Sequence, residues 1–358
     1  MFTRKAALIL LLILIGSTAA GCVGSATVAP WSSLLAVDNA VYMGSQVARV
    51  YALDAQNGAS LWAYPTAAEK SLPSGFYGAP AVVGDTVYIG GFNGHVYALD
   101  ANTGVLRADS AVASDRIVAD MVADEAGTLY VASYDHKVYA VRATDGAKKW
   151  EFTTSNWVWG APAVHGGKVY VASLDHKLYC LDAETGAKQW EFKAGGALAG
   201  GPQVDGGLVF VGSLDGKVYA LDANSGQLRW DYQTKHWVWA HPLVVDGLVY
   251  AGSLDKKLYA LDSATGTQKW AFDAQGMIRA TPAYADGVLY VGTEAGALWA
   301  VDAQSGQQKW SFKAERSILT SPVVSSGTVY VCGLGDTVYA LDANTGVQRW
   351  TTVPSKKQ

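Results

Sequence analysis

The sequence has 358 residues, of which half are hydrophobic and 16% are charged. It carries 27 basic and 31 acidic residues, a net charge of -4, with no lysine- or arginine-rich block, which argues against nucleic-acid binding and polybasic membrane docking. Its 39 glycines and 10 prolines are typical of a large all-β core with many tight turns.

The N-terminus has the pattern of a secretory signal. Two basic residues at 4–5 begin it, residues 6–15 form an apolar run, and the small residues 19–21 precede Cys22. The apolar run is too short to span a membrane, and small residues before a cleavage point are typical of a signal peptide. We therefore predict that residues 1–21 are removed and that the mature chain lies outside the cytoplasm.

The Ala-Ala-Gly-Cys sequence that ends at Cys22 resembles the bacterial lipobox, in which cleavage occurs before the cysteine and the cysteine carries the lipid. The resemblance implies a lipid anchor on Cys22, followed by a linker over residues 22–29. It implies attachment to the periplasmic side of the outer membrane in a two-membrane cell, or otherwise to the outer face of the plasma membrane. Ala19 departs from the leucine of the family pattern, so cleavage by ordinary signal peptidase with a free Cys22 is the alternative.

A repeat dominates the rest of the chain. The segment Tyr-Ala-Leu-Asp-Ala-x-x-Gly-x-x-x-Trp at 51–62 recurs with intervals of 46, 42 and then five times 40 residues. Its glycine falls at Gly58, Gly104, Gly146, Gly186, Gly226, Gly266, Gly306 and Gly346. The eight copies predict one domain over residues 30–353, followed by a polar tail at 354–358.

Each unit reads as four short strands. In the copy at 160–194, the expected strands are 160–164, 168–173, 177–182 and 188–192, separated by turns rich in Gly, Asp and His. Four strands per 40-residue repeat are typical of one propeller blade, and near-continuous apolar strands indicate blades that are covered on both faces. The prediction is an all-β fold, an eight-bladed β-propeller of four-stranded antiparallel blades.

The repeat resembles the pyrroloquinoline quinone (PQQ) repeat of quinoprotein dehydrogenases and of the BamB-type outer-membrane assembly lipoprotein. The resemblance rests on the Tyr-x-Leu-Asp segment and the Ala-x-x-x-Gly-x-x-x-Trp ending, in eight copies over the mature chain. It supports the propeller fold, whereas a fold shared by several functions does not specify one of them.

Residues that recur in every unit are predicted to be structural. The motif aspartates precede Gly turns, where a carboxylate accepts backbone N–H bonds. The motif tryptophans each bury about 200 Å² and are expected to dock one blade on the next, with Ala108 in place of the one expected in the second unit. They are Trp62, Trp150, Trp190, Trp230, Trp270, Trp310 and Trp350.

Residues that the repeat does not demand are the candidates for function. Aligned on the proline before the first strand, the units read Pro80, Val122, Pro162, Pro202, Pro242, Pro282 and Pro322. Three residues earlier stand Tyr77, Ala119, Trp159, Ala199, Trp239, Arg279 and Leu319, and Trp157 and Trp237 come two residues before two of these.

The residues that lead into first strands are expected at the mouth of the central channel. The predicted binding site therefore comprises Tyr77, Trp157, Trp159, Trp237, Trp239 and Arg279. Aromatic and arginine side chains are typical binding anchors. The other interpretation is that the wide hole of an eight-bladed ring is filled by large side chains that act as plugs.

No catalytic residue, cofactor or metal site is predicted. No His-x-x-x-His or Cys-x-x-Cys spacing exists, so neither zinc nor haem has support. For a quinoprotein dehydrogenase, the resemblance would imply adjacent cysteines, a calcium held by Glu, Asn and Asp, and a base Asp. The sequence has no Cys-Cys pair, and the bare 40-residue intervals leave no insertion to exclude water from a reacting centre.

We expect a monomeric, non-catalytic scaffold of the cell envelope, held at the membrane by its lipid and binding an envelope protein partner. Assembly of outer-membrane proteins, as the BamB resemblance implies, is the more specific form of this function. A ligand-sensing or adhesive cell-surface propeller is the alternative, and a PQQ-dependent dehydrogenase is a further one.

Overall fold

The computed structural model describes residues 33–45, 47–66 and 75–354. All the strands belong to the compact unit Trp31–Gln358. The expected signal peptide 1–21, the lipidation residue Cys22, the linker 22–29 and residues 355–358 lie outside the described residues.

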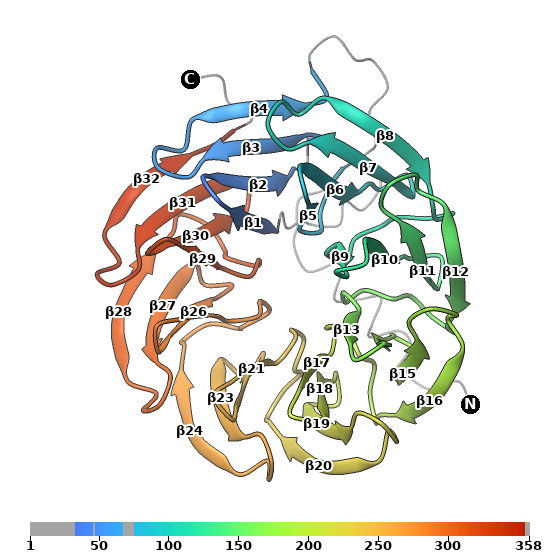
Figure 1. Cartoon of the computed structure of the whole chain (residues 1–358). Helices are drawn as coiled ribbons and strands as arrows, with labels where there is room; N and C mark the ends of the chain where they lie inside the picture. The colour runs from blue at the N-terminus through green and yellow to red at the C-terminus, as the bar shows by residue number, and fades with distance from the viewer. Residues whose placement is uncertain (1–32, 46, 67–74, 355–358) are drawn as a thin grey trace, which may run out of the picture. The chain divides into compact units, whose positions relative to one another are not determined.

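The described residues form 32 strands, which make eight four-stranded antiparallel sheets arranged in a ring (Figure 1). Blades 1 to 4 contain β1 (Leu34–Val37), β2 (Ala40–Gly44), β3 (Val50–Asp54), β4 (Ser60–Tyr64); β5 (Ala81–Val83), β6 (Thr86–Gly90), β7 (His95–Asp100), β8 (Leu106–Ala111); β9 (Val122–Ala123), β10 (Thr128–Ala132), β11 (Lys137–Arg142), β12 (Lys148–Thr153); and β13 (Ala163–His165), β14 (Lys168–Ala172), β15 (Lys177–Asp182), β16 (Lys188–Lys193).

Blades 5 to 8 contain β17 (Gln203–Asp205), β18 (Leu208–Gly212), β19 (Lys217–Asp222), β20 (Leu228–Gln233); β21 (Leu243–Val245), β22 (Leu248–Gly252), β23 (Lys257–Asp262), β24 (Gln268–Asp273); β25 (Ala283–Ala285), β26 (Val288–Gly292), β27 (Ala297–Asp302), β28 (Gln308–Lys313); and β29 (Val323–Ser325), β30 (Thr328–Gly333), β31 (Thr337–Asp342), β32 (Gln348–Thr352). The predicted eight-bladed all-β propeller is confirmed.

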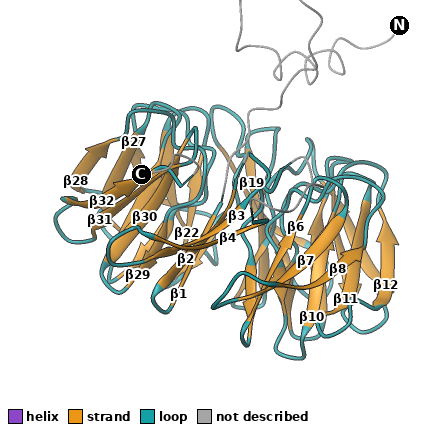
Figure 2. Ribbon diagram, turned by 90° about the horizontal axis from the view of Figure 1, so that it is seen from above, coloured by secondary structure: helices purple, strands orange, loops and turns teal. Residues whose placement is uncertain are grey.

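Chain order sets which loops share a face of the ring. Within a blade the strands run from the inside outward, so the turns after the second strand lie on the same face as the connections between blades. We call this the connection face. The other two turns of each blade lie on the opposite face (Figure 2). No described segment forms a helix long and apolar enough to cross a membrane.

The core lies between neighbouring blades, because both faces of each sheet are covered. The second and third strands are almost fully buried, as in β14 and β15, where Tyr170 pairs with Cys180. Val169 and Val171 of this blade pack with Tyr130 and Ala132 of the preceding blade. Burial on both faces explains why these strands are apolar at nearly every position.

The motif tryptophans join each blade to the next. Their indole N–H groups donate to backbone carbonyl oxygens of the following blade at 2.9–3.2 Å. At Trp230 the acceptor is Ser263, and the ring lies so close to Gly266 that an added Cβ would stand 2.7 Å from it. The motif glycine is therefore required both by its positive φ and by the neighbouring indole.

The motif aspartates fix the turn that follows the third strand. Asp222 accepts backbone N–H bonds from Asn224 and Ser225 at 3.0 and 2.9 Å. The guanidinium of Arg229 and the hydrogen bonds from Ser225 hold the pKa of the Asp222 carboxyl well below its ordinary value. These carboxylates are half-buried turn caps rather than paired acid and base groups.

The first blade (β1–β4) and the last blade (β29–β32) are each built from four consecutive strands, so neither takes a described strand from the other end of the chain. The ring therefore closes by side-chain contacts between these two blades. Trp350 Nε1 and the hydroxyl of Tyr330 both donate to the carbonyl oxygen of Ala55 at 3.0 Å. The hydroxyl of Ser45 donates to the buried Asp336 at 2.7 Å. The closing junction thus repeats the contact between other blades and adds one buried hydrogen bond.

Cys180 and Cys332 are both free and buried. Burial raises the pKa of the Cys180 thiol to about 11 and also raises that of Cys332. We therefore expect both thiols to react slowly with a thiol reagent in the native protein and fully in unfolded, non-reduced protein. Cys180 lies in blade 4 and Cys332 in blade 8, on opposite sides of the ring, too far apart for a disulfide. If the unfolded protein has no reactive thiol, this order of the blades is wrong.

The junction between blades 2 and 3 lacks its indole. Ala108 occupies the tryptophan position, Ser110 lies against Gly146 instead, and a cavity of about 10 Å³ remains beside them. Because an unfilled contact loses packing energy, we expect backbone amides of β8 and β9 to exchange hydrogen faster than their equivalents at the other junctions. Hydrogen-exchange mass spectrometry with equal protection at all junctions would contradict this.

Candidate binding site

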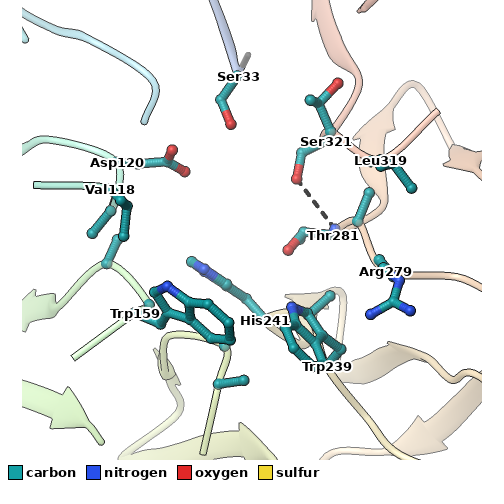
Figure 3. A pocket seen from close by; sticks show the side chains of 18 of the residues that line it. Ser33, Val118, Asp120, Trp159, Trp239, His241, Arg279, Thr281, Leu319 and Ser321 are labelled. Carbon is teal, nitrogen blue, oxygen red and sulfur yellow. Dashed lines mark hydrogen bonds between the residues drawn. The ribbon is translucent and has the colours of Figure 1, made fainter. Parts of the chain in front are cut away.

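Six of the residues predicted from sequence reach the connection face at or beside one channel cavity. This cavity has a volume of about 120 Å³, and Tyr77, Trp159, Trp239 and Arg279 line it. The last three of these residues are labelled in Figure 3. Trp157 and Trp237 do not line it, but their rings lie 6.5 Å from those of Trp159 and Trp239.

The two inner tryptophans meet across an intervening blade. The ring centroids of Trp159, which leads into blade 4, and Trp239, which leads into blade 6, are 5.3 Å apart. Between them, blade 5 presents Ala199 and two glycines, Gly200 and Gly201. An added Cβ at Gly201 would stand 2.2 Å from the Ala161 carbonyl oxygen, so only glycine fits there. The small residues of blade 5 thus leave the space in which the indoles make contact.

A chain of ring contacts continues from these tryptophans toward blade 2. Trp159 donates its indole N–H to the hydroxyl of Tyr134, whose ring stacks on Trp157 with centroids 4.9 Å apart. The guanidinium of Arg116 lies 5.6 Å from the Tyr134 ring and 5.5 Å from the Phe92 ring.

The chain ends at an aromatic pair on blade 2 and at an ion pair on blade 7. Phe92 stacks on Tyr77 at 4.1 Å. At the other end, Arg279 lies 5.1 Å from the Trp239 ring and forms an ion pair with Glu294. We call this surface the aromatic–arginine band; it comprises Tyr77, Phe92, Arg116, Tyr134, Trp157, Trp159, Trp237, Trp239 and Arg279.

The sequence alignment of blade 3 is wrong by one residue. Tyr130 pairs with Val122 where the equivalent Tyr170 of blade 4 pairs with Ala163. The proline position of blade 3 is therefore Met121 rather than Val122, and Val118 rather than Ala119 corresponds to Trp159. The long loop before this blade obscured the register, and the shift places Arg116 at the position of Trp157.

Two other residues of the band and the ion-pair partner of Arg279 were missed, although the sequence carries a signal for them. In the turn after the second strand, the blades with the regular repeat have leucine, as at Leu174. Phe92, Tyr134 and Glu294 replace that leucine in blades 2, 3 and 7. The turn residue donates its backbone N–H to the connection, as Leu174 does to Trp157 and Tyr134 does to Arg116. Departures from leucine at this turn therefore mark side chains beside the channel mouth.

The band is half-buried rather than enclosed. Tyr77 and Tyr134 are buried, whereas the four tryptophans, Arg116 and Arg279 each keep part of their surface exposed. Within the described residues, no group of three or more His, Cys, Asp or Glu side chains lies close enough together to hold a metal ion. Exposed indole faces beside arginines can bind an apolar or aromatic surface of a partner.

Two protein-family models match the chain. One, described as outer membrane protein assembly factor BamB, matches residues 21–126 and 115–199. The other, described as the β-propeller of the beta-alanine-activating enzyme, matches residues 169–357. A comparison with curated proteins found no match.

Solved structures with the same fold are similar at low sequence identity. The computationally designed Ika8 protein matches with a TM-score of 0.77 and 17% identity, over 87% of this chain and 96% of that one. BamB from Moraxella catarrhalis matches with a TM-score of 0.72 and 18% identity, over 86% and 95%.

An enzyme shares the fold as well. The quinohemoprotein alcohol dehydrogenase ADHIIG from Pseudomonas putida HK5 matches with a TM-score of 0.64 and 18% identity, over 76% of this chain and 66% of that one. The family models, the eight repeats and the ring of eight blades agree with one another. The chain belongs to the family of PQQ-like β-propellers of the BamB type.

Proposed function

We propose that this protein is a non-catalytic scaffold of the cell envelope, anchored by a lipid on Cys22, that binds a protein partner through the aromatic–arginine band. The observation that carries the proposal is the contact between Trp159 and Trp239, 5.3 Å apart and half-exposed at the channel mouth. No blade needs these residues for docking, because the motif tryptophans already perform that role. The description of the BamB family model supports assembly of outer-membrane proteins as the process.

The channel lining supports a scaffold better than a PQQ-dependent dehydrogenase. Among the described residues, Asp120 is the one carboxylate that lines the cavity, whereas the dehydrogenase resemblance implies Glu, Asn and Asp around a calcium. The cavity volume of about 120 Å³ is also below the range of about 300–1,000 Å³ typical of pockets that enclose drug-sized ligands. The lining therefore does not fit the dehydrogenase cofactor.

The anchor is tested by metabolic labelling with a palmitate analogue. Wild-type protein should carry the label and Cys22→Ser should not, because the lipobox cysteine is the acylated residue. Equal labelling of the two proteins would exclude the lipid anchor on Cys22. In membrane fractionation, wild-type protein should be found with the membranes and Cys22→Ser in the soluble fraction.

Partner binding is tested by cross-linking in native envelopes and identification of the captured protein. Wild-type protein should capture the same protein as Val347→Ala, a matched control at an apolar residue that is 65% exposed in a turn of the opposite face. Trp239→Ala should capture much less of it at equal protein level. A ligand-sensing propeller, the alternative function, predicts no captured protein that depends on Trp239.

A further inference from the structure

A second ring of residues lies next to the aromatic–arginine band in the channel. The strand registers show that the residue just before the proline position is equivalent in all blades. Five blades place a polar side chain there, and all five line the channel cavity (Figure 3). These five residues, which we call the waist ring, are Ser33, Asp120, His241, Thr281 and Ser321.

Among the residues that the structure describes, no lysine or arginine forms an ion pair with the one carboxylate of this cavity, Asp120. Arg279 is the only lysine or arginine in its described lining, and Arg279 is paired with Glu294. Asp120 forms no ion pair with any described residue. One of its carboxylate oxygens accepts the backbone N–H of Ala79 at 2.6 Å, and its carboxylate points toward the centre of the cavity (Figure 3). Charge complementarity therefore favours a cationic ligand.

The remaining waist-ring groups can accept hydrogen bonds from such a ligand. Removal of the His241 imidazole from bulk water lowers its pKa, although the Asp120 carboxylate acts in the opposite direction. The lowered pKa favours the neutral imidazole, which offers a ring nitrogen as an acceptor. The hydroxyl oxygens of Ser33 and Thr281 lie around the same space (Figure 3). A primary ammonium group has three donors and no acceptor, which matches this set.

The wall of the cavity suits the rest of the ligand. The indoles of Trp159 and Trp239 form one side of it. Indole faces attract cations and pack well against methylene groups. An alkyl chain along these rings would place its terminal ammonium group at Asp120.

We propose that the channel binds a primary alkylammonium group, which is either the side chain of a partner's lysine or a free alkylamine. The proposal goes beyond docking at the band, because it depends on Asp120 and holds whether or not a protein covers the mouth. The proposal also accounts for Asp120, because the other seven blades have no carboxylate at the equivalent position.

Isothermal titration of the mature protein with n-butylammonium chloride tests the site at constant ionic strength. We expect saturable binding, which n-butanol, of nearly the same shape but uncharged, does not show. Asp120→Asn should weaken binding about tenfold or more, because it removes a charge-assisted hydrogen bond. This variant keeps an oxygen to accept the N–H of Ala79, so the fold is retained. Asp205→Asn, at an exposed carboxylate that ends β17 and has no ion pair among the described residues, should leave binding unchanged.

A parallel titration with N-acetyl-lysine N-methylamide distinguishes the two sources. Tighter binding of the lysine derivative indicates a partner's side chain, and tighter binding of butylammonium indicates a free amine; both support the site when Asp120→Asn weakens them. No saturable binding to the wild type, or equal binding to wild type and Asp120→Asn, overturns the proposal. Capture of the envelope partner is measured separately, so failure of the docking function would be distinguishable from failure of this one.

Discussion

Replacement of Trp230 by alanine is expected to lower the free energy of unfolding by about 3–5 kcal/mol. The indole is only 9% exposed, packs on the face of Gly266, and donates its N–H to Ser263 of blade 6 at 2.9 Å. Truncation leaves a void between blades 5 and 6 and a carbonyl oxygen with one donor fewer. Urea unfolding followed by circular dichroism measures the change.

Trp230→Phe is the matched control for this prediction. It keeps a ring against Gly266 but loses the hydrogen bond to Ser263, so its loss should be smaller than that of alanine. Leu228→Ala, at a residue of the same strand that is 45% exposed, should change stability little. A loss at Trp230→Ala no larger than that at Leu228→Ala would show that the indole does not hold the junction.

Replacement of Trp239 by alanine is expected to weaken partner binding by about 2 kcal/mol or more. The ring is half-exposed, and its contacts are the Trp159 ring at 5.3 Å and the Arg279 guanidinium at 5.1 Å. Loss of these contacts should cost about 1 kcal/mol of folding stability, far less than at Trp230. Affinity for the captured partner and urea unfolding of the same samples separate the two effects.

Trp159→Ala and Arg279→Ala should show the same division between binding and stability. Arg279 is held by Glu294, so Glu294→Gln should weaken binding less than Arg279→Ala because the arginine itself remains. If Trp159→Ala, Trp239→Ala and Arg279→Ala all lose stability while binding per folded molecule is unchanged, these side chains are channel plugs. The functional surface would then lie on the outer loops.

Much of the fold was predictable because its determinants are local or periodic. The cap at Asp222 joins residues two and three positions apart, and the apolar second and third strands recur in every unit. The docking of Trp230 on Gly266 was predictable because each motif tryptophan meets the motif glycine of the next unit, and this pair exists at seven junctions. Ala108 marked the exception in the sequence, and the structure leaves a small cavity there.

The site was predictable only in part. Tyr77, Trp159, Trp239 and Arg279 were found because they depart from the repeat at an aligned position. Arg116 was missed because the loop before blade 3 shifts that alignment by one residue. No period marks such an insertion, and only the pairing of Tyr130 with Val122 fixes the register.

The sequence by itself determined the blade, the number of blades and the residues that hold neighbouring blades together, because hydrogen bonds and packing repeat every 40 residues. Tertiary structure alone decided which side chains meet in the channel. Trp159 contacts Trp239 because blade 5 is small at Ala199, and Asp120 faces His241 from more than 100 positions away in the chain. Such meetings depend on the closure of the ring and on the volumes of side chains from several blades, which no single repeat encodes.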